Sequence, residues 1–236
     1  MMTEAPKKPP QPIRDAATLI LYRFDAGRLQ VLLGERAASN AFMPKTYVFP
    51  GGRLDLADYR VRPAAPLNVA TAARFARARV TGPRKALALA LAAIRETFEE
   101  TGLRLAGPAS RAFKGEPPEG WGEFCTADDC LLAPDPSALT YVCRAVTPPQ
   151  RPRRFDARFF AAPASAATGE LRPSEELGNL LWITPDDAAR LDLPPITQEV
   201  LHRLPDWLAE PALHNPDLGV PFYRRGYSGK DMMVLE

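Results

Sequence analysis

The sequence predicts an α+β domain in which a mixed β-sheet lies between helices. Apolar strand-like segments and helical segments alternate at irregular intervals, and a hydrophobic content of 46% is enough to bury a core. A wound parallel fold would instead repeat a regular strand–helix–strand unit. The first dozen residues are polar and rich in proline, so we expect residues 1–12 to be a disordered tail and residues 13–236 to be a single domain.

The first part of this domain predicts a hairpin, a third strand and a tight turn. Residues 16–22 and 29–33 are apolar, and Asp-Ala-Gly at 25–27 favours a turn between them. Residues 47–49 predict a strand that runs into the Pro-Gly-Gly turn at 50–52. Two consecutive glycines allow the backbone to bend sharply and to expose its amides and carbonyls.

Three glutamates, Glu96, Glu99 and Glu100, are the most informative feature of the chain. At about 100° per residue they project from one arc of a helix, where like charges at this spacing repel one another. Residues 86–94 are alanine, leucine and one isoleucine, so the helix is largely buried, and Gly102 favours the left-handed conformation that ends it. A solvated acidic face explains this pattern less well than a bound cation, and such oxygen ligands suit Mg²⁺ or Mn²⁺.

The second half predicts three further strands, at 138–146, 154–161 and 180–183. Proline and glycine cluster at 106–122 and 147–153, which we interpret as loops.

Two helices are expected near the end of the chain. Thr184 is the predicted N-cap of the first helix, with Pro185 at its first position. Residues 196–208 predict an amphipathic helix that is capped at Thr197.

The Pro-Gly-Gly turn and the glutamate helix together resemble the Nudix box, whose pattern is G-x5-E-x7-R-E-U-x-E-E-x-G-U, with U an aliphatic residue. Gly52 matches the first glycine, Asp58 stands where the pattern has glutamate, and Asp55 is a further acid between them. These two aspartates are expected to hold the turn or to bind a metal through water. Thr97 replaces an aliphatic residue. The second half of the pattern is matched by Arg95, Glu96, Glu99, Glu100, Gly102 and Leu103.

The main departure from the pattern is an insertion. Between Asp58 and Arg95 lie 36 residues instead of seven, which places the insertion at about 59–84. The branch of the Nudix superfamily that contains the peroxisomal acyl-CoA diphosphatases tolerates such an insertion. Phe42-Met43-Pro44 and residues 152–160 also resemble that branch.

A motif that CoA-cleaving Nudix enzymes often carry, L-L-T-x-R-[SA]-x3-R-x3-G-x3-F-P-G-G, is matched in part. Arg36 and Ala37 fit after a pair of leucines, and Phe-Pro-Gly-Gly at 49–52 lies at the matching distance. Ala41 and Lys45 depart from the motif. For the leucines alone, a core strand followed by a loop is the simpler interpretation.

The insertion is basic. Residues 59–94 contain six arginines, one lysine and no acid, and residues 69–80 are rich in alanine with arginine at helical intervals, which predicts an added helix. A solvated basic face and a substrate-binding role are equally compatible with this pattern. In the second case Arg74 and Arg77 would bind a phosphate remote from the metal, such as the 3′-phosphate of CoA. A second basic cluster, which contains Arg154, is the rival candidate for that role.

The resemblance implies the Nudix fold, an α/β/α sandwich around a mixed sheet, with a helical insertion. It also implies a metal-dependent hydrolase that cleaves a diphosphate linkage in a nucleoside diphosphate derivative. CoA or acyl-CoA is the first candidate substrate, giving 3′,5′-ADP and a phosphopantetheine derivative. Two alternatives stay open: the same chemistry on ADP-ribose, NADH or another nucleotide, and a non-catalytic domain that senses a nucleotide.

The resemblance assigns roles to individual residues. Catalysis falls to Glu96, Glu99 and Arg95, with Glu96 or Glu99 as the base and Arg95 orienting Glu99. A late loop offers Glu175 and Glu176 as further candidates for the base. The expected ligands of Mg²⁺ or Mn²⁺ are Glu96, Glu99, Glu100 and a main-chain carbonyl near Gly51. The expected substrate-binding residues are Arg36, Gly52, Arg74, Arg77 and Arg154.

Composition limits the partners. A net charge of +2 argues against a nucleic-acid binder, and no apolar run reaches the roughly 20 residues of a membrane span. We therefore expect a small-molecule nucleotide or CoA substrate and neither a nucleic acid nor a membrane partner, while a homodimer stays open. Cys125, Cys130 and Cys143 lack metal-ligand spacing, which predicts free thiols and a cytoplasmic location.

Overall fold

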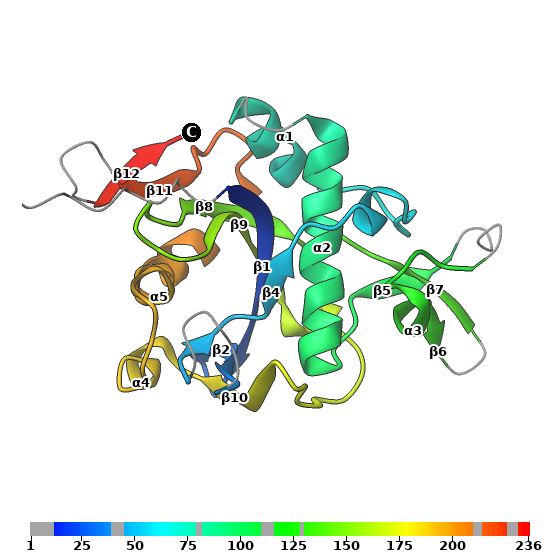
Figure 1. Cartoon of the computed structure of the whole chain (residues 1–236), viewed down its shortest axis with the longest axis horizontal. Helices are drawn as coiled ribbons and strands as arrows, with labels where there is room; N and C mark the ends of the chain where they lie inside the picture. Colours follow the sequence, from blue (N-terminus) through cyan, green and yellow to red (C-terminus); the bar gives the residue numbers. More distant parts are fainter. Residues whose placement is uncertain are drawn as a thin grey trace, which may run out of the picture.

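The computed structural model describes residues 12–38, 45–78, 82–109, 116–127, 130–209, 214–225 and 231–236. A curved sheet runs through the molecule, with helix α2 (Pro83–Thr101) across one face and helix α5 (Pro195–Leu208) on the other (Figure 1). The predicted α+β sandwich around a mixed sheet is therefore confirmed. Three sequence expectations lie outside the described residues: the tail up to residue 11, the Phe42-Met43-Pro44 segment and the position of Ala41.

The main sheet has nine strands. Seven of them follow the order β10-β2-β1-β9-β8-β11-β12, and the short strands β3 (Tyr47–Val48) and β4 (Gly51–Arg53) pair with β2 and β1 outside this path. Strand β1 pairs antiparallel with β2 and parallel with β9, so the sheet is mixed. The bounds of the seven strands are β1 (Ile13–Asp25), β2 (Arg28–Arg36), β8 (Thr140–Val146), β9 (Arg154–Pro163), β10 (Leu177–Ile183), β11 (Pro221–Arg225) and β12 (Asp231–Leu235).

Alternate side chains of β1 enter two separate cores, as expected for a sheet that is covered on both faces. Leu19 and Leu21 pack in the core formed with α2. Ile20 and Tyr22 point the other way and pack in the core that contains Leu201 of α5. The sheet thus fixes α2 on one face, and α2 carries the glutamates.

The strands predicted from the sequence are all present. Strand β4 was predicted as part of the glycine turn, and two further groups of strands were not predicted. The hairpin β11–β12 was missed because β11 joins the sheet by pairing with β8, a long-range contact. A second small sheet, in the order β5-β7-β6, packs with the short helix α3 (Gly122–Cys125) beside α2 (Figure 1). Its strands are β5 (Ala106–Pro108), β6 (Thr126–Ala127) and β7 (Cys130–Pro134).

The predicted loop at 106–122 is wrong at its start, because residues 106–108 form β5. Strand β5 pairs only with β7, and Pro108 is tolerated at such an edge because the missing N–H is not needed there. The predicted loop at 147–153 is confirmed, since β8 ends before it and β9 begins after it.

The alanine-rich part of the insertion forms helix α1 (Val69–Arg77), which confirms the predicted added helix. Asn68 caps this helix by accepting a hydrogen bond from the N–H of Thr71 (2.8 Å). Helix α1 lies beside the N-terminal end of α2, whereas the glutamates lie towards the other end (Figure 1). The insertion therefore packs away from the glutamates.

Helix α4 (Pro185–Ala188) begins as predicted, because Thr184 accepts a hydrogen bond from the N–H of Asp187 (3.2 Å). The predicted cap of α5 at Thr197 is wrong. Helix α5 starts at Pro195, Pro194 before it makes no side-chain capping bond, and Thr197 is buried within the first turn. A proline at the first position has no N–H to satisfy, which lessens the need for a cap. None of the described helices combines the length and apolar character that a membrane span requires.

Candidate active site

The C-terminal half of α2 presents the three glutamates on one side of a buried helix. Glu100 is buried, Glu96 is partly buried and Glu99 is the most exposed of the three. The helix ends as predicted at Gly102, which has a φ of 75° and donates its N–H to the carbonyl oxygen of Phe98 (2.8 Å).

The Pro-Gly-Gly turn packs directly against this arc of glutamates. The N–H of Gly51 donates to Oε2 of Glu100 (2.8 Å). A Cβ added to Gly52 would lie 2.3 Å from Cδ of Glu96, closer than any side chain tolerates. Only glycine therefore lets the Glu96 carboxylate rest on this stretch of backbone. The two halves of the sequence motif meet here in space.

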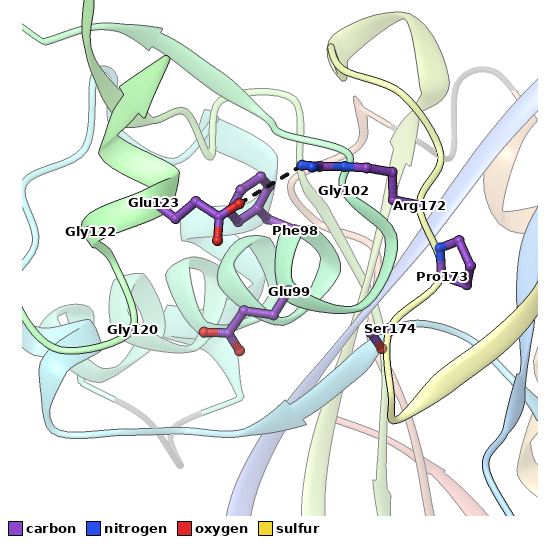
Figure 2. A pocket seen from close by; sticks show the side chains of 9 residues that line it. All are labelled: Phe98, Glu99, Gly102, Gly120, Gly122, Glu123, Arg172, Pro173 and Ser174. Atoms are coloured by element: carbon purple, nitrogen blue, oxygen red, sulfur yellow. Dashed lines mark ion pairs between the residues drawn. The ribbon is translucent and has the colours of Figure 1, made fainter.

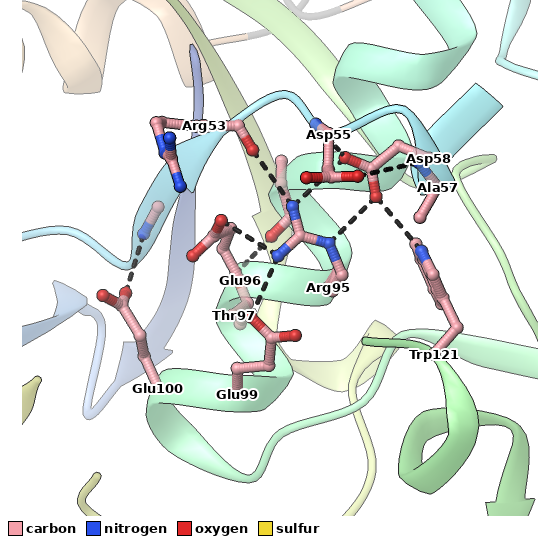
Figure 3. A network of polar contacts seen from close by, with 12 residues as sticks. Arg53, Asp55, Ala57, Asp58, Arg95, Glu96, Thr97, Glu99, Glu100 and Trp121 are labelled. Carbon is pink, nitrogen blue, oxygen red and sulfur yellow. Dashed lines mark hydrogen bonds and ion pairs between the residues drawn. The ribbon is translucent and has the colours of Figure 1, made fainter. Parts of the chain in front are cut away.

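Arg95 holds two of the glutamates from the side (Figure 3). Its Nη1 donates to Oε1 of Glu96 (3.0 Å) and to Oε2 of Glu99 (2.9 Å). Its Nη2 donates to the carbonyl oxygen of Arg53 (3.0 Å), directly after the glycine turn. The predicted contact between Arg95 and Glu99 is present, and the structure adds Glu96 to it.

Asp58 lies on the other side of Arg95 and forms a bidentate ion pair with it. Nε of Arg95 donates to Oδ1 (2.9 Å) and Nη2 donates to Oδ2 (3.1 Å). The Asp58 carboxylate also accepts from the N–H of Asp55 (2.8 Å) and from Nε1 of Trp121 (3.1 Å). Asp55 in turn accepts from the N–H of Ala57 (2.9 Å). Of the two roles expected for these aspartates, the contacts match holding the turn.

Burial dominates the electrostatics of the site. Desolvation raises the pKa of Glu96 to about 7, although the charge of Arg95 acts in the opposite direction. Desolvation and the nearby charge of Glu96 raise the pKa of Glu100 to about 8. Desolvation also raises the pKa of Glu99. Burial lowers the pKa of Arg95, but its hydrogen bond to Asp58 and the surrounding carboxylates outweigh that effect and raise it.

These donors fit a divalent cation that is shared with a substrate. A nearby dication stabilises the charged forms of carboxylates that burial and mutual repulsion disfavour. Within the described ranges, no group of three or more His, Cys, Asp and Glu side chains is arranged to hold a metal by itself. Arg95 draws Glu96 and Glu99 towards itself, and Gly51 holds Glu100. Such a set suits Mg²⁺ or Mn²⁺, which are coordinated by a few carboxylates together with waters and substrate phosphates.

A pocket of about 590 Å³ lies beside Glu99, at the end of α2 (Figure 2). One wall comes from α2 and from Gly120, Gly122 and Glu123, and the other comes from residues 172–174. Arg172 and Glu123 face each other across it, with 3.9 Å between Nη2 and Oε1. The volume is within the range of small-molecule sites.

Among the arginines expected to bind substrate, Arg36 lies nearest the glutamates. It stands at the end of β2, and its positive charge lowers the pKa of Glu100. Its buried Nε has no hydrogen-bond partner among the described residues.

The other three expected substrate arginines are not brought to the glutamates. Arg74 is buried on α1 and donates Nη1 to the carbonyl oxygen of Tyr141 (2.8 Å). Arg77 pairs with Asp217 at the surface. Arg154 lies at the start of β9 and donates to the carbonyl oxygen of Thr147 (3.3 Å). Their placement gives no support to a role in substrate binding.

The late loop reaches the site through Glu176. Its charge contributes to the raised pKa values of both Glu99 and Glu100. Its carbonyl oxygen accepts from the N–H of Ala37 (3.1 Å), so the loop is fastened to the end of β2. Glu175 is exposed.

Sequence reasoning missed Gly120 and Trp121, because they lie in a segment that was expected to be a loop. Trp121 is fully buried beside Asp58, and Gly120 lies against Arg95 and Glu99. A lone tryptophan after a glycine carries no motif, so no sequence signal could have identified them.

Comparisons with known proteins agree with this fold. No protein-family model matches the chain. The crystal structure of a NUDIX hydrolase from Alicyclobacillus acidocaldarius superimposes with a TM-score of 0.59 at 27% identity, covering 87% of this chain and 93% of that one.

Two curated relatives are named acyl-coenzyme A diphosphatase NUDT19. The chain is 28% identical to the Gallus gallus protein and 24% identical to the Xenopus laevis protein, over 74% and 67% of its own length. It spans 62% and 53% of the length of these relatives. Together the likenesses show the Nudix hydrolase fold and support a hydrolase.

Proposed function

We propose that this chain, whose fold is that of the Nudix hydrolases, is a metal-dependent hydrolase of a diphosphate linkage in a nucleoside diphosphate derivative. The observation that carries the proposal is the packing of Glu96 and Glu100 against the Gly51–Gly52 turn while Arg95 holds Glu96 and Glu99. Buried carboxylates of this kind suit a divalent cation and a phosphate-bearing substrate.

CoA or acyl-CoA is the substrate class we propose, with 3′,5′-ADP and a phosphopantetheine derivative as products. Support comes from the two relatives that are named acyl-coenzyme A diphosphatases and from the partial CoA motif, which Arg36, Ala37 and residues 49–52 match. ADP-ribose or NADH is the second candidate, because Ala41 and Lys45 depart from that motif.

In the proposed mechanism, Glu96, Glu99 and Glu100 hold Mg²⁺ or Mn²⁺, helped by a main-chain carbonyl near Gly51. When bound, the metal neutralises the diphosphate and acidifies a water for in-line attack. Glu96 or Glu99 accepts the proton of the attacking water. Arg95 keeps both carboxylates on the side of α2 that faces the glycine turn.

Residues around the glutamates would complete the site. Glu176 is a third candidate for the base, since the late loop brings its charge close to Glu99. Arg36 would offer its guanidinium to a phosphate oxygen of the substrate beside Glu100. The part of the substrate that extends past Glu99 would enter the pocket between Glu123 and Arg172.

The test is incubation of the purified protein with Mg²⁺ or Mn²⁺ and a panel of CoA, acyl-CoA, ADP-ribose and NADH, with products identified by mass. Glu99→Gln serves as the control, because it removes one proposed ligand with little change in shape. Release of 3′,5′-ADP from CoA species, lost in the control, is the expected result.

Other outcomes of this panel separate the candidates. Turnover of ADP-ribose or NADH alone would overturn the CoA assignment but keep the hydrolase. Tight metal-free binding of a nucleotide without any turnover would replace the enzyme with a nucleotide sensor.

A further inference from the structure

Trp121 is a buried indole whose polar edge faces the Arg95 network (Figure 3). The residue is 0% exposed, and its Nε1–H donates to Oδ1 of Asp58 (3.1 Å). The ring packs edge-on against Phe124, with 5.0 Å between centroids and 74° between planes. Phe124 packs in the same manner on Phe98 of α2 (5.4 Å, 87°). Packing therefore fixes the direction of the indole N–H.

The acceptor of this bond is a carboxylate with no access to water. Asp58 has a side-chain exposure of 0%, and its carboxylate oxygens accept hydrogen bonds from Arg95, Asp55 and Trp121. Oδ1 is shared between Nε of Arg95 and Nε1 of Trp121. A shift of Asp58 would therefore move the guanidinium that it holds.

Gly120, directly before Trp121, brings the main chain against the side chains of Arg95 and Glu99. Gly120 has a φ of 79°, which favours glycine. A Cβ at this position would lie 3.3 Å from Cδ of Arg95 and 3.3 Å from Oε1 of Glu99. The backbone at Gly120 therefore lies directly against the side chains of Arg95 and Glu99.

We propose that Trp121 is a positioning residue of the active site, acting through Asp58 and Arg95 on Glu96 and Glu99. The indole N–H fixes Asp58, Asp58 fixes the guanidinium, and Nη1 of the guanidinium fixes Oε1 of Glu96 and Oε2 of Glu99. The effect on catalysis rests on the proposed function, whereas the effect on carboxylate geometry does not.

The same segment contributes to the pocket, and this allows the two roles to be separated. Gly122 and Glu123, directly after Trp121, line the pocket beside Glu99, whereas Trp121 does not. Loss of positioning should therefore lower kcat and metal affinity, while loss of the pocket wall should raise KM.

The test compares Trp121→Phe, which keeps an aromatic ring and removes the N–H, with Trp207→Phe, a half-buried tryptophan of α5 on the other face of the sheet. Manganese affinity is measured by electron paramagnetic resonance, without substrate, alongside kcat and KM for the best substrate. We expect Trp121→Phe to raise the Kd of Mn²⁺ and to lower kcat by about 10-fold each, with KM within about 2-fold. Trp207→Phe should change none of these values.

A double-mutant cycle tests whether the effect passes through the guanidinium. In an Arg95→Lys background the bidentate bond to Asp58 is gone, so Trp121→Phe should cause no further loss. The proposal would be overturned if Trp121→Phe weakened Mn²⁺ binding and kcat as much in the Arg95→Lys background as in the wild type. It would also be overturned if Trp121→Phe alone kept the wild-type Kd and kcat. If Trp121→Phe does not fold, Gly120→Ala replaces it, since a Cβ there presses on Arg95 and Glu99; wild-type Mn²⁺ affinity in that variant would also overturn it.

The manganese readout keeps this proposal separate from the proposed function. A wild-type protein that binds Mn²⁺ but hydrolyses nothing would refute the activity, and the shift in Kd would still decide the role of Trp121. If the wild-type protein binds no Mn²⁺ without substrate but hydrolyses one, the change in kcat decides the role of Trp121. A wild-type protein that neither binds Mn²⁺ nor hydrolyses any substrate would refute both proposals.

Discussion

Asp58 and Arg95 meet in a bidentate ion pair that is almost wholly removed from water. The contacts are 2.9 Å and 3.1 Å, and the side-chain exposures are 0% and 8%. The insertion separates the two residues by 37 positions, yet the pair joins the segment after the glycine turn to the glutamate helix. The site tolerates the insertion because this ion pair holds the segment around Asp58 against the glutamate helix, while α1 packs beside the N-terminal end of α2.

Asp58→Asn should therefore cost both stability and activity. The change leaves the Arg95 guanidinium buried without its counter-charge, and loss of one partner of a buried pair typically costs about 3–5 kcal/mol. We expect the free energy of unfolding, measured by urea denaturation, to fall by about 3 kcal/mol, and kcat to fall at least about 10-fold.

The matched control is Asp217→Asn, which breaks an exposed ion pair with Arg77. Exposed pairs contribute about 0–1 kcal/mol, so this variant should remain close to wild type. Equal losses in the two variants would contradict a special role for the buried pair.

Gly52→Ala should abolish most activity without unfolding the protein. The new Cβ would lie 2.3 Å from Cδ of Glu96, at the tip of a side chain that can rotate away. Displacement of a proposed metal ligand by about 1 Å is expected to lower kcat about 100-fold. Steady-state kinetics and circular dichroism check both parts.

Gly82→Ala is the control for this change, because a Cβ there meets nothing within 4 Å and the φ of −67° suits any residue. It should keep wild-type kcat. A fully active Gly52→Ala protein would show that Glu96 need not rest on the turn.

The glutamate helix and its glycine turn could be predicted from the sequence because both follow local rules. Alanine and leucine at 86–94 require burial, Gly102 adopts the left-handed conformation, and the spacing of Glu96, Glu99 and Glu100 sets one arc. The contact between Glu96 and Gly52 then follows once the two segments are placed together.

What sequence reasoning could not supply are contacts between distant segments. Trp121 reaches Asp58 across 63 positions, and strand β11 joins β8 far from it in the chain. Charge patterning left the insertion open between a solvated basic face and a phosphate-binding face. It could not reveal that Arg74 is turned inward and donates to main-chain carbonyls.

Arg74→Ala should accordingly act on stability rather than on substrate binding. The guanidinium donates to the carbonyl oxygens of Tyr141 (2.8 Å) and Asn215 (3.2 Å), and its loss leaves buried acceptors and a cavity. We expect the free energy of unfolding to fall by about 2–4 kcal/mol. KM for CoA and for dephospho-CoA should stay unchanged.

Arg77→Ala is the comparison, since Arg77 lies on the same helix as Arg74 and forms an exposed ion pair with Asp217. This variant should lower the free energy of unfolding by less than about 1 kcal/mol. A rise of KM for CoA alone in either variant would restore the phosphate-binding role of the insertion.

The buried glutamates predict that the metal-free protein is less stable at higher pH. The pKa of Glu96 is raised to about 7 and that of Glu100 to about 8, against an ordinary value of 4.5 that we take for the unfolded chain. A raised pKa means that the folded state holds its protons more tightly, so this stability is present below pH 4.5 and is lost as the pH rises towards 8. Thermal unfolding with a chelator should therefore show a melting temperature that falls across this window. In a Glu96→Gln, Glu100→Gln protein that fall should be much smaller.

Metal binding should show the opposite dependence on pH, because a divalent cation requires the ionised carboxylates. The affinity for Mn²⁺ should rise between pH 6 and 8, where Glu96 and Glu100 lose their protons, and by up to about 10-fold per pH unit for each proton released. Calorimetry in buffers of different ionisation enthalpy measures that proton release directly. An affinity that does not change with pH, and no released proton, would mean that the glutamates are already ionised before the metal binds. In that case Arg95 rather than the proton would be what balances their charge, and Arg95→Gln, which removes that positive charge, should then restore the missing pH dependence.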